Sequence, residues 1–211
     1  MRILNLYTGI GGNRKLWPPG HEITAIENNN KIAKIYQKHF PNDNVIITDA
    51  HDFLLKHFQE YDFIWSSPPC QSHSKIQILF NKNIPKFPDL KLYEEILFLK
   101  HYFKGQWVVE NTKSYYTPLI KPQYLSGHFY WSNFIIATLK ENHRDFGENA
   151  FHKEKQHTLE LQEKLGFNIN LKGKELRSAI RNCVQPTAGL HVFNCAFKLK
   201  QKKIGDAFNV R

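Results

Sequence analysis

Short apolar runs and stretches of helical spacing alternate along the first half of the chain. The apolar runs predict five strands, at 2–7, 22–27, 44–48, 61–65 and 106–109. Apolar residues three or four apart predict helices at 31–40, 53–58 and 90–103, with Pro41 ending the first and Asp52 a candidate N-cap of the second. Because strands and helices alternate, we expect an α/β fold with a doubly wound, mostly parallel Rossmann-like sheet.

The pattern weakens after Thr112. It predicts a strand at 129–137, a helix at 174–182 and another strand at 190–197, while residues 140–175 are mostly polar. The tail at 198–203 is basic and is expected to be exposed. A length of 211 residues suits one ordinary domain, or one domain with a small appendage.

Composition narrows the class of protein. No apolar run approaches the ~18 residues of a membrane span, and the apolar start is too short for a signal peptide, so we expect a cytoplasmic protein without a membrane partner. Three widely spaced cysteines without a CxxC pair argue against a disulfide framework or a zinc knuckle. The histidines fit no metal motif, so no metal is expected. Cys183 and Cys195 are interpreted as small buried hydrophobic residues.

The charge balance is strongly basic. Lysine and arginine number 29 against 19 aspartate and glutamate residues, which gives a formal net charge of +10 and a pI of about 9.4. Such an excess attracts polyanions, chiefly nucleic acid, although a solvated basic surface would have the same composition.

A glycine-rich turn, Tyr7-Thr8-Gly9-Ile10-Gly11-Gly12, directly follows the first predicted strand. Glycines allow a tight turn and close approach of a ligand, and a helix expected after the turn would offer its N-terminus. Glu27 ends the second strand, where a carboxylate can accept hydrogen bonds from both ribose hydroxyls of a nucleoside. The glycine spacing differs from GxGxxG, which disfavours NAD. Asp49, after the third strand, is either an acceptor for an adenine amino group or a helix cap.

Two further sites follow the fourth and fifth strands. Cys70, in Pro68-Pro69-Cys70-Gln71, falls where ligands bind in an open parallel sheet, and the prolines restrict the approach to its thiol. A thiolate there is a candidate nucleophile. Glu110 and Asn111 end the fifth strand. A carboxyl at the rim of the core can have a raised pKa and donate a proton, and a strand-end salt bridge is the alternative for Glu110.

Together these motifs resemble the C5-cytosine DNA methyltransferase family, over residues 2–112. The glycine turn is similar to the first family motif, Glu27 to the second, Asp49 to the third, Pro69-Cys70-Gln71 to the catalytic motif and Glu110-Asn111 to the Glu-Asn-Val motif, with Thr112 in place of valine.

The resemblance implies a short family member that uses S-adenosyl-L-methionine. The implied cofactor-binding residues are Tyr7, Thr8, Gly9, Ile10, Gly11, Gly12, Glu27, Asn28, Asp49, Ala50 and Pro68. The implied catalytic residues are Cys70, Glu110, Pro69, Gln71 and Asn111. Candidate nucleic-acid contacts are Ser72, Ser74, Arg144, Arg177 and Arg181. Ordinary loop or domain-closing roles are equal alternatives for these serines and for Arg177 and Arg181.

The second half departs from the family pattern. Where the family has a Gln-Arg-x-Arg run, this chain has Gly127-His128-Phe129-Tyr130-Trp131-Ser132, and Arg144 is the nearest candidate arginine. We expect a catalytic and cofactor-binding domain at 1–137, a reduced target-recognition region at 138–195 and a C-terminal segment at 196–211 that returns to the catalytic domain. Within that segment, Ile204-Gly205-Asp206-Ala207-Phe208 is faintly similar to the last family motif.

The implied activity is methyl transfer to C5 of cytosine in double-stranded DNA, through a covalent Cys70 adduct and base flipping. A bacterial or phage-encoded monomer, as in restriction–modification, is expected. Three alternatives stay open: an RNA (tRNA) cytosine C5 methyltransferase, a catalytically silent nucleic-acid-binding relative, and, less favoured by the glycine spacing, an NAD oxidoreductase.

Overall fold

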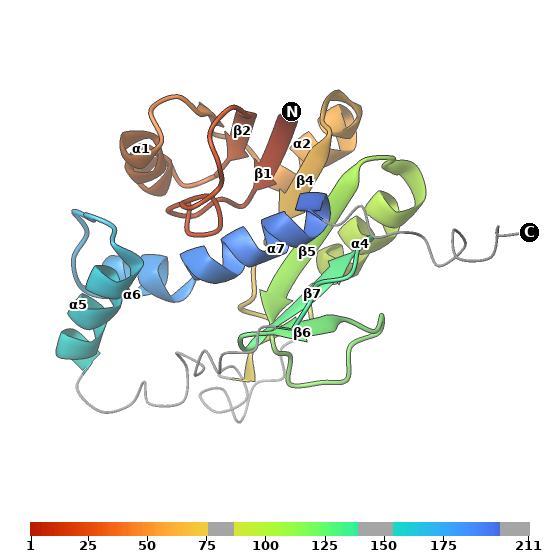
Figure 1. Ribbon diagram of the computed structural model, residues 1–211. Coiled ribbons are helices and arrows are strands. Elements are labelled where there is room, and N and C mark those ends of the chain that lie inside the picture. The colour runs from red at the N-terminus through yellow and green to blue at the C-terminus, as the bar shows by residue number, and fades with distance from the viewer. Residues whose placement is uncertain (76–86, 139–153, 199–211) are drawn as a thin grey trace, which may run out of the picture.

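A computed structural model describes residues 1–75, 87–138 and 154–198 (Figure 1). Its centre is a seven-stranded sheet in the order β3-β2-β1-β4-β5-β7-β6. The strands are β1 (Arg2–Leu6), β2 (Glu22–Ile26), β3 (Asn44–Ile46), β4 (Phe63–Ser66), β5 (Gln106–Thr112), β6 (Gln123–Leu125) and β7 (His128–Ser132). β1 to β5 pair in parallel, and β7 runs antiparallel to both β5 and β6. The expected mostly parallel sheet is thus confirmed.

The helices of the described ranges are α1 (Asn30–His39), α2 (Ala50–His57), the 3-10 helix η1 (Phe58–Glu60), α4 (Lys91–Tyr102), α5 (Glu154–Leu165), α6 (Gly173–Arg181) and α7 (Pro186–Lys198). α1 begins where the Asn29 side chain accepts hydrogen bonds from the backbone N–H groups of Lys31 and Ile32. α1, α4 and α6 lie within a residue of their predicted ranges.

Different helices cover the two faces of the sheet. α7 crosses one face, while α2 and α4 cover the other (Figure 1). Because side chains alternate along a strand, Ile3 joins the first face and Leu4 the second. The α7 face buries Ile3, Phe63, Trp65, Val108, Val192 and Phe193. The α2 and α4 face buries Leu4, Leu54, Ile64, Ile96, Leu99 and Val109. A third cluster joins α1, α5 and α6 to Ile10.

The strand predicted at 190–197 is wrong, because this segment belongs to helix α7. The helix has a buried face formed by residues four apart, Ala188, Val192 and Ala196. It begins at Pro186, before the apolar run that indicated a strand. Gly189 lets α7 approach the chain closely, since a Cβ there would lie 2.4 Å from the Asn13 carbonyl oxygen. The domain boundaries stay a prediction, although α7 packs on the sheet of the first predicted domain.

Three local predictions are corrected. Asp49, not Asp52, caps α2, and its side chain accepts from the backbone N–H of Asp52 at 2.9 Å. No helix follows the glycine turn, because residues 11–20 form turns and Pro18-Pro19-Gly20 precede β2. The strand predicted at 129–137 ends at Ser132, and an unforeseen β6 pairs with it. Ser126 and Gly127 join β6 to β7 with φ values of 47° and 82°, as in a tight hairpin turn.

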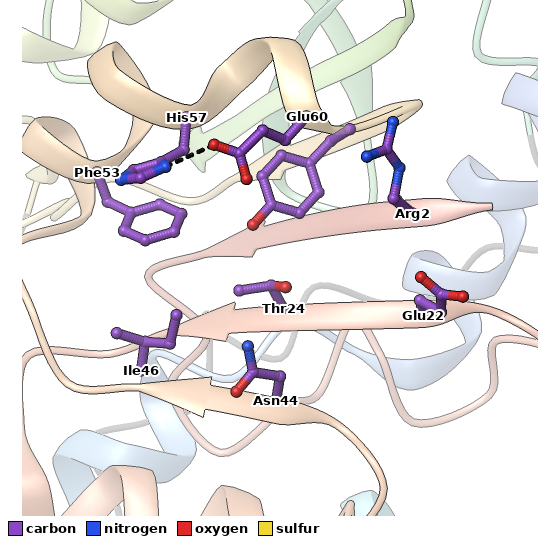
Figure 2. A pocket seen from close by; sticks show the side chains of 9 residues that line it. Arg2, Glu22, Thr24, Asn44, Ile46, Phe53, His57 and Glu60 are labelled. Atoms are coloured by element: carbon purple, nitrogen blue, oxygen red, sulfur yellow. Dashed lines mark hydrogen bonds and ion pairs between the residues drawn. The ribbon is translucent and has the colours of Figure 1, made fainter.

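A cavity of about 340 Å³ lies beside β1, β2 and β3 (Figure 2), and neither Cys70 nor Glu110 lines it. Its lining residues are Arg2, Glu22, Thr24, Asn44, Ile46, Phe53, His57, Glu60 and Tyr61. Arg2 and Glu22 are the first residues of β1 and β2, so the cavity reaches the amino ends of these strands. No helix in the described ranges combines the length and apolar character of a membrane span.

Gly189→Ala should destabilise the protein. Alanine favours an exposed helix over glycine by about 1 kcal/mol, but here its Cβ would meet the Asn13 backbone at 2.4 Å. Overpacking of this kind costs roughly 1–3 kcal/mol. We therefore expect urea unfolding to show a loss of about 1–2 kcal/mol in the free energy of unfolding. The exposed Thr187→Ala in the same helix is the control and should change stability by less than about 0.5 kcal/mol. Unchanged or increased stability in Gly189→Ala would contradict the close docking of α7.

Candidate active site at the carboxyl ends of β1, β4 and β5

The glycine turn reverses the chain sharply after β1. Tyr7, Gly9 and Gly11 have φ values of 55°, 53° and 87°, in the left-handed region that glycine adopts freely and tyrosine does not. The Gly9 N–H donates to Glu27 Oε2 at 3.0 Å, and the Asn29 N–H donates to Glu27 Oε1 at 2.9 Å. Glu27, just beyond β2, therefore fixes the shape of the turn.

The three glycines of the turn have different surroundings. A Cβ on Gly9 would meet nothing within 4 Å, so the space in front of it is open. A Cβ on Gly11 would lie 2.3 Å from the Phe40 ring, and one on Gly12 would lie 2.1 Å from the Val184 carbonyl oxygen. Gly11 and Gly12 are therefore needed for packing against other parts of the chain, and Gly9 is the glycine that a ligand can approach.

The turn fits a nucleoside cofactor. The buried Thr8 hydroxyl has no hydrogen-bond partner, and it lies next to the open space at Gly9. Each oxygen of the half-buried Glu27 carboxylate has one backbone donor, which leaves lone pairs for ribose hydroxyls. Asn28 and Asp49 are exposed, and Ala50 and Ile10 are buried. The role of Asp49 toward adenine stays a prediction, while its role as a helix cap is observed.

Cys70 lies on a tight turn beyond the end of β4. Its carbonyl oxygen accepts from the backbone N–H groups of His73 and Ser74, both at 3.0 Å. The buried Pro68 before it offers its carbonyl to the Asn111 side-chain amide at 2.9 Å, while Pro69 and Gln71 are exposed. Burial, reinforced by the charge of Glu110, raises the pKa of the Cys70 thiol to about 11. The free thiol is thus mostly protonated at neutral pH, and a reaction that uses the thiolate would require loss of this proton.

Glu110 is a buried carboxyl within β5, next to Cys70. It is 6% exposed, and burial raises its pKa, while the charge of His128 and a hydrogen bond with Ser67 act in the opposite direction. The protonated form that burial favours can donate a hydrogen bond to a base. The same form also removes the negative charge that holds up the pKa of Cys70. Among the described residues, Glu110 has one possible ion-pair partner, the His128 ring at 3.8 Å.

The turn that carries Cys70 is anchored by a cluster of ring side chains. His73 is 1% exposed, and its Nδ1 lies 2.6 Å from the Tyr116 hydroxyl, which in turn accepts from the Tyr93 hydroxyl at 3.3 Å. Burial lowers the pKa of His73, so the ring is held neutral. A bridge between Ser74 and Ser114 joins the turn to the segment after β5. These contacts hold the position of Cys70 relative to Glu110.

A buried carboxyl that the sequence did not indicate lies beneath both parts of the site. Glu95 of α4 is fully buried and accepts from the Tyr7 hydroxyl at 2.6 Å and from the Ser66 hydroxyl at 2.6 Å. His51 Nδ1 lies 3.1 Å from the same carboxyl. Helical spacing puts Glu95 on the same apolar face of α4 as Leu92 and Leu99. This placement was the one signal in the sequence that could have indicated a buried carboxyl. Glu95 therefore joins the glycine turn to the strand that leads to Cys70.

The candidate nucleic-acid contacts are dispersed. The Ser72 hydroxyl accepts from the Asp89 N–H at 3.0 Å, and Ser74 bridges to Ser114. Arg177 and Arg181 lie on α6, where Arg181 is exposed and Arg177 is half-buried. Arg144 and the segment 204–208 lie outside the described residues. Within the described part of the chain, no three His, Cys, Asp or Glu side chains gather as metal ligands would.

The fold and the site define a class. A sheet in the order β3-β2-β1-β4-β5-β7-β6, with β7 antiparallel and a glycine turn after β1, is the Rossmann-like fold of S-adenosylmethionine-dependent methyltransferases. Residues 1–84 match the family model described as "C-5 cytosine-specific DNA methylase". The N-terminal part of the chain is therefore similar to C5-cytosine methyltransferases, and the glycine turn has the open space and the acceptors that a nucleoside cofactor such as S-adenosyl-L-methionine requires.

Curated relatives match over part of their length. The chain is 27% identical over 121 residues to mouse tRNA (cytosine(38)-C(5))-methyltransferase, covering 54% of this chain and 29% of that one. It is 32% identical over 82 residues to the rat protein of the same name, covering 36% and 21%. The chain thus spans less than a third of these relatives. The structure of a Spodoptera frugiperda DNMT2 mutant overlaps 53% of this chain and 35% of its own, at 27% identity and a TM-score of 0.38.

His51 should make stability depend on pH. Its hydrogen bond with Glu95 raises the pKa of His51 above the ordinary value of 6.5, against the effect of burial. A raised pKa in the folded state stabilises the protein below the pKa of the unfolded state, and this stabilisation is lost as pH rises through the folded value. The stability advantage of wild type over His51→Gln should therefore be largest below pH 6.5 and shrink above it. Urea unfolding at several pH values checks this, with the exposed His101→Gln as control. An advantage that grows with pH would contradict the assignment.

Proposed function

We propose that this chain methylates C5 of cytosine in double-stranded DNA, with Cys70 as a covalent nucleophile. The proposal rests chiefly on one observation. Cys70 follows β4 and the buried acid Glu110 lies in the neighbouring strand β5, while β1, which leads into the glycine turn, pairs with β4 on its other side. The family match over residues 1–84, which include Cys70 but end before Glu110, supports the same chemistry.

The proposed chemistry addresses the low nucleophilicity of cytosine C5. The Cys70 sulfur bonds to C6, and the electrons of the C5–C6 double bond move to C5. Covalent attack of this kind replaces one difficult step by easier ones. S-adenosylmethionine supplies an electrophilic methyl group at this point. Afterwards the C5 proton leaves, the bond from sulfur to C6 breaks and the ring regains its double bond.

Glu110 and Asn111 support the attack. In its acid form Glu110 donates a hydrogen bond to N3 of the base, which offsets the charge that builds on the ring. The loss of negative charge at Glu110 also eases deprotonation of the Cys70 thiol. Asn111 does not need to touch the base, because its side chain donates to the Pro68 carbonyl at 2.9 Å and so positions the cysteine turn against β5.

The surroundings of the site suit a nucleic acid. Lys75 follows the cysteine turn, Lys113 follows the Glu110 segment, and Lys121 precedes β6; all three are exposed. Cations at these places can hold phosphates while the target base is flipped from the duplex, a step that costs roughly a few kcal/mol. The net charge of +10 favours the encounter.

Methylation of tRNA is the second candidate. The curated relatives that match over residues of this chain are named as tRNA (cytosine(38)-C(5))-methyltransferases. The chemistry at Cys70 and Glu110 would be unchanged, since single-stranded RNA loops already present unstacked bases.

Cys70→Ala should abolish covalent trapping. Incubated with S-adenosylmethionine and DNA containing 5-fluorocytosine, the wild type should form an adduct that survives denaturing electrophoresis, because the fluorine cannot leave as the C5 proton does. Methyl transfer by Cys70→Ala should fall by at least about 1,000-fold. Cys195→Ala is the matched control, since that cysteine is buried in α7. An adduct in Cys70→Ala would overturn the mechanism, and no adduct in the wild type with either nucleic acid would favour a silent nucleic-acid-binding relative.

Duplex DNA should be the better acceptor. We expect transfer of a labelled methyl group to cytosine-rich duplex DNA to exceed transfer to tRNA by at least about 10-fold at matched salt, with affinity falling as salt rises. Bisulfite sequencing of the products identifies the modified cytosines. The opposite ranking would replace DNA by tRNA as the substrate and leave the role of Cys70 intact.

A further inference from the structure

Glu110 lies where a lone carboxylate would be unstable. It is buried within β5, and the groups that face it are Ser67 and Cys70 beyond β4 and Tyr130 and His128 on β7. The Tyr130 hydroxyl is buried without a hydrogen-bond partner. No ion pair between Glu110 and a lysine or arginine occurs among the residues that the structure describes, so His128 is the cation available to it.

The register of the sheet places His128 next to Glu110. In the antiparallel pairing of β5 with β7, Glu110 is opposite Tyr130, and Thr112 is opposite His128. Residues two apart on a strand share a face, so His128 and Glu110 are diagonal neighbours. The His128 Nε2 atom lies 3.8 Å from Glu110 Oε1. His128 begins β7 directly after the tight turn at Ser126 and Gly127, which sets the position of its ring.

A second contact fixes which ring nitrogen faces Glu110. His128 Nδ1 lies 3.1 Å from the Ser126 carbonyl oxygen. A carbonyl oxygen can only accept, so Nδ1 carries a proton and donates it to Ser126, and Nε2 is the ring nitrogen that faces Glu110. The side chain of His128 is 36% exposed, whereas that of Glu110 is 7% exposed. His128 thus connects the buried carboxyl with solvent.

We propose that His128 is the counter-ion of Glu110, and that a positive charge at this position shifts the pH range in which Glu110 can act as an acid. The inference rests on the proposed function for its catalytic consequence, although the electrostatic pairing does not depend on it. His128 occupies the segment where the family's arginines were expected. His128 is a positioning residue, since it acts through Glu110.

The sign of the effect follows from charge. A cation beside a carboxyl favours the carboxylate, so protonated His128 lowers the pKa of Glu110, against the rise caused by burial. His128→Gln removes the cation and should raise the pKa of Glu110. His128→Arg makes the cation permanent and should lower it. The two variants should differ on the order of one pH unit for a partly exposed pair at this distance.

The test measures Glu110 directly. The carboxyl carbon of Glu110 is followed by 13C NMR during pH titration of wild type, His128→Gln and His128→Arg, with its signal assigned by its loss in Glu110→Gln. We expect the midpoint in His128→Arg to lie about one pH unit below that in His128→Gln. The exposed His101→Gln is the matched control and should leave the midpoint where it is in the wild type. Equal midpoints in His128→Gln and His128→Arg, or the reverse order, would overturn the pairing.

Methyl transfer gives the second readout. The alkaline limit of kcat should fall at lower pH in His128→Arg than in His128→Gln by a similar interval, whereas a purely structural role would change activity without moving the limit. If the two variants had the same alkaline limit of kcat but different NMR midpoints for Glu110, the proposed effect of His128 on catalysis would be overturned. Absence of methyl transfer in the wild type, with the NMR midpoints separated as expected, would refute the proposed function and leave the counter-ion intact.

Discussion

The arrangement of the site depends on one buried carboxyl, Glu95. Its oxygens receive the hydroxyls of Tyr7 and Ser66 and face His51, so one residue of α4 holds the turn after β1, the end of β4 and the first turn of α2. A buried carboxyl is costly unless it is fully hydrogen-bonded. The geometry that satisfies Glu95 therefore fixes the distance between the cofactor turn and the strand that leads to Cys70.

Tyr7 shows how this constraint reaches the ligand site. Its φ of 55° is unfavourable for a side chain with a Cβ, and its hydroxyl is held by Glu95 at 2.6 Å. The left-handed residue begins the turn that brings the Gly9 N–H to Glu27. The turn is closed from the opposite side by packing, because Gly12 contacts the segment before α7 and Gly189 of α7 contacts Asn13. Helix α7 therefore helps to hold the glycine turn in place.

The protonation states of Cys70 and Glu110 depend on each other. Burial raises the pKa of both Cys70 and Glu110, and a charged Glu110 raises that of Cys70 further. Protonation of Glu110 removes the charge that raises the pKa of Cys70. The protonated carboxyl is also the form that can donate a hydrogen bond to a nucleobase. His128 Nε2 lies 3.8 Å from Glu110 Oε1, and a protonated His128 ring favours the carboxylate form of Glu110. The three side chains belong to three neighbouring segments of the sheet, and Glu110 interacts electrostatically with each of the other two.

Much of the first half of the fold could be predicted, because parallel strands buried on both faces carry a strong apolar signal. β1 to β5, α1 and α4 followed from it. The pattern failed for α7, whose small buried residues Ala188, Gly189 and Ala196 give little hydrophobic contrast, and for β6, which has three residues. The sequence could not decide which aspartate caps α2, because Asp49 and Asp52 are the same residue type. Only the backbone conformation shows that the helix begins after Asp49.

The sequence by itself determined the nature of the chemistry: a cysteine after one strand, an acid in the next and a glycine turn before both, which parallel pairing must bring to one edge. Only the tertiary structure decided how those groups are tuned. Glu95 lies 88 residues from Tyr7, and His128 reaches Glu110 through antiparallel pairing of β5 with β7. Burial and charge at these places arise from contacts distant in sequence, and no local pattern encodes such contacts.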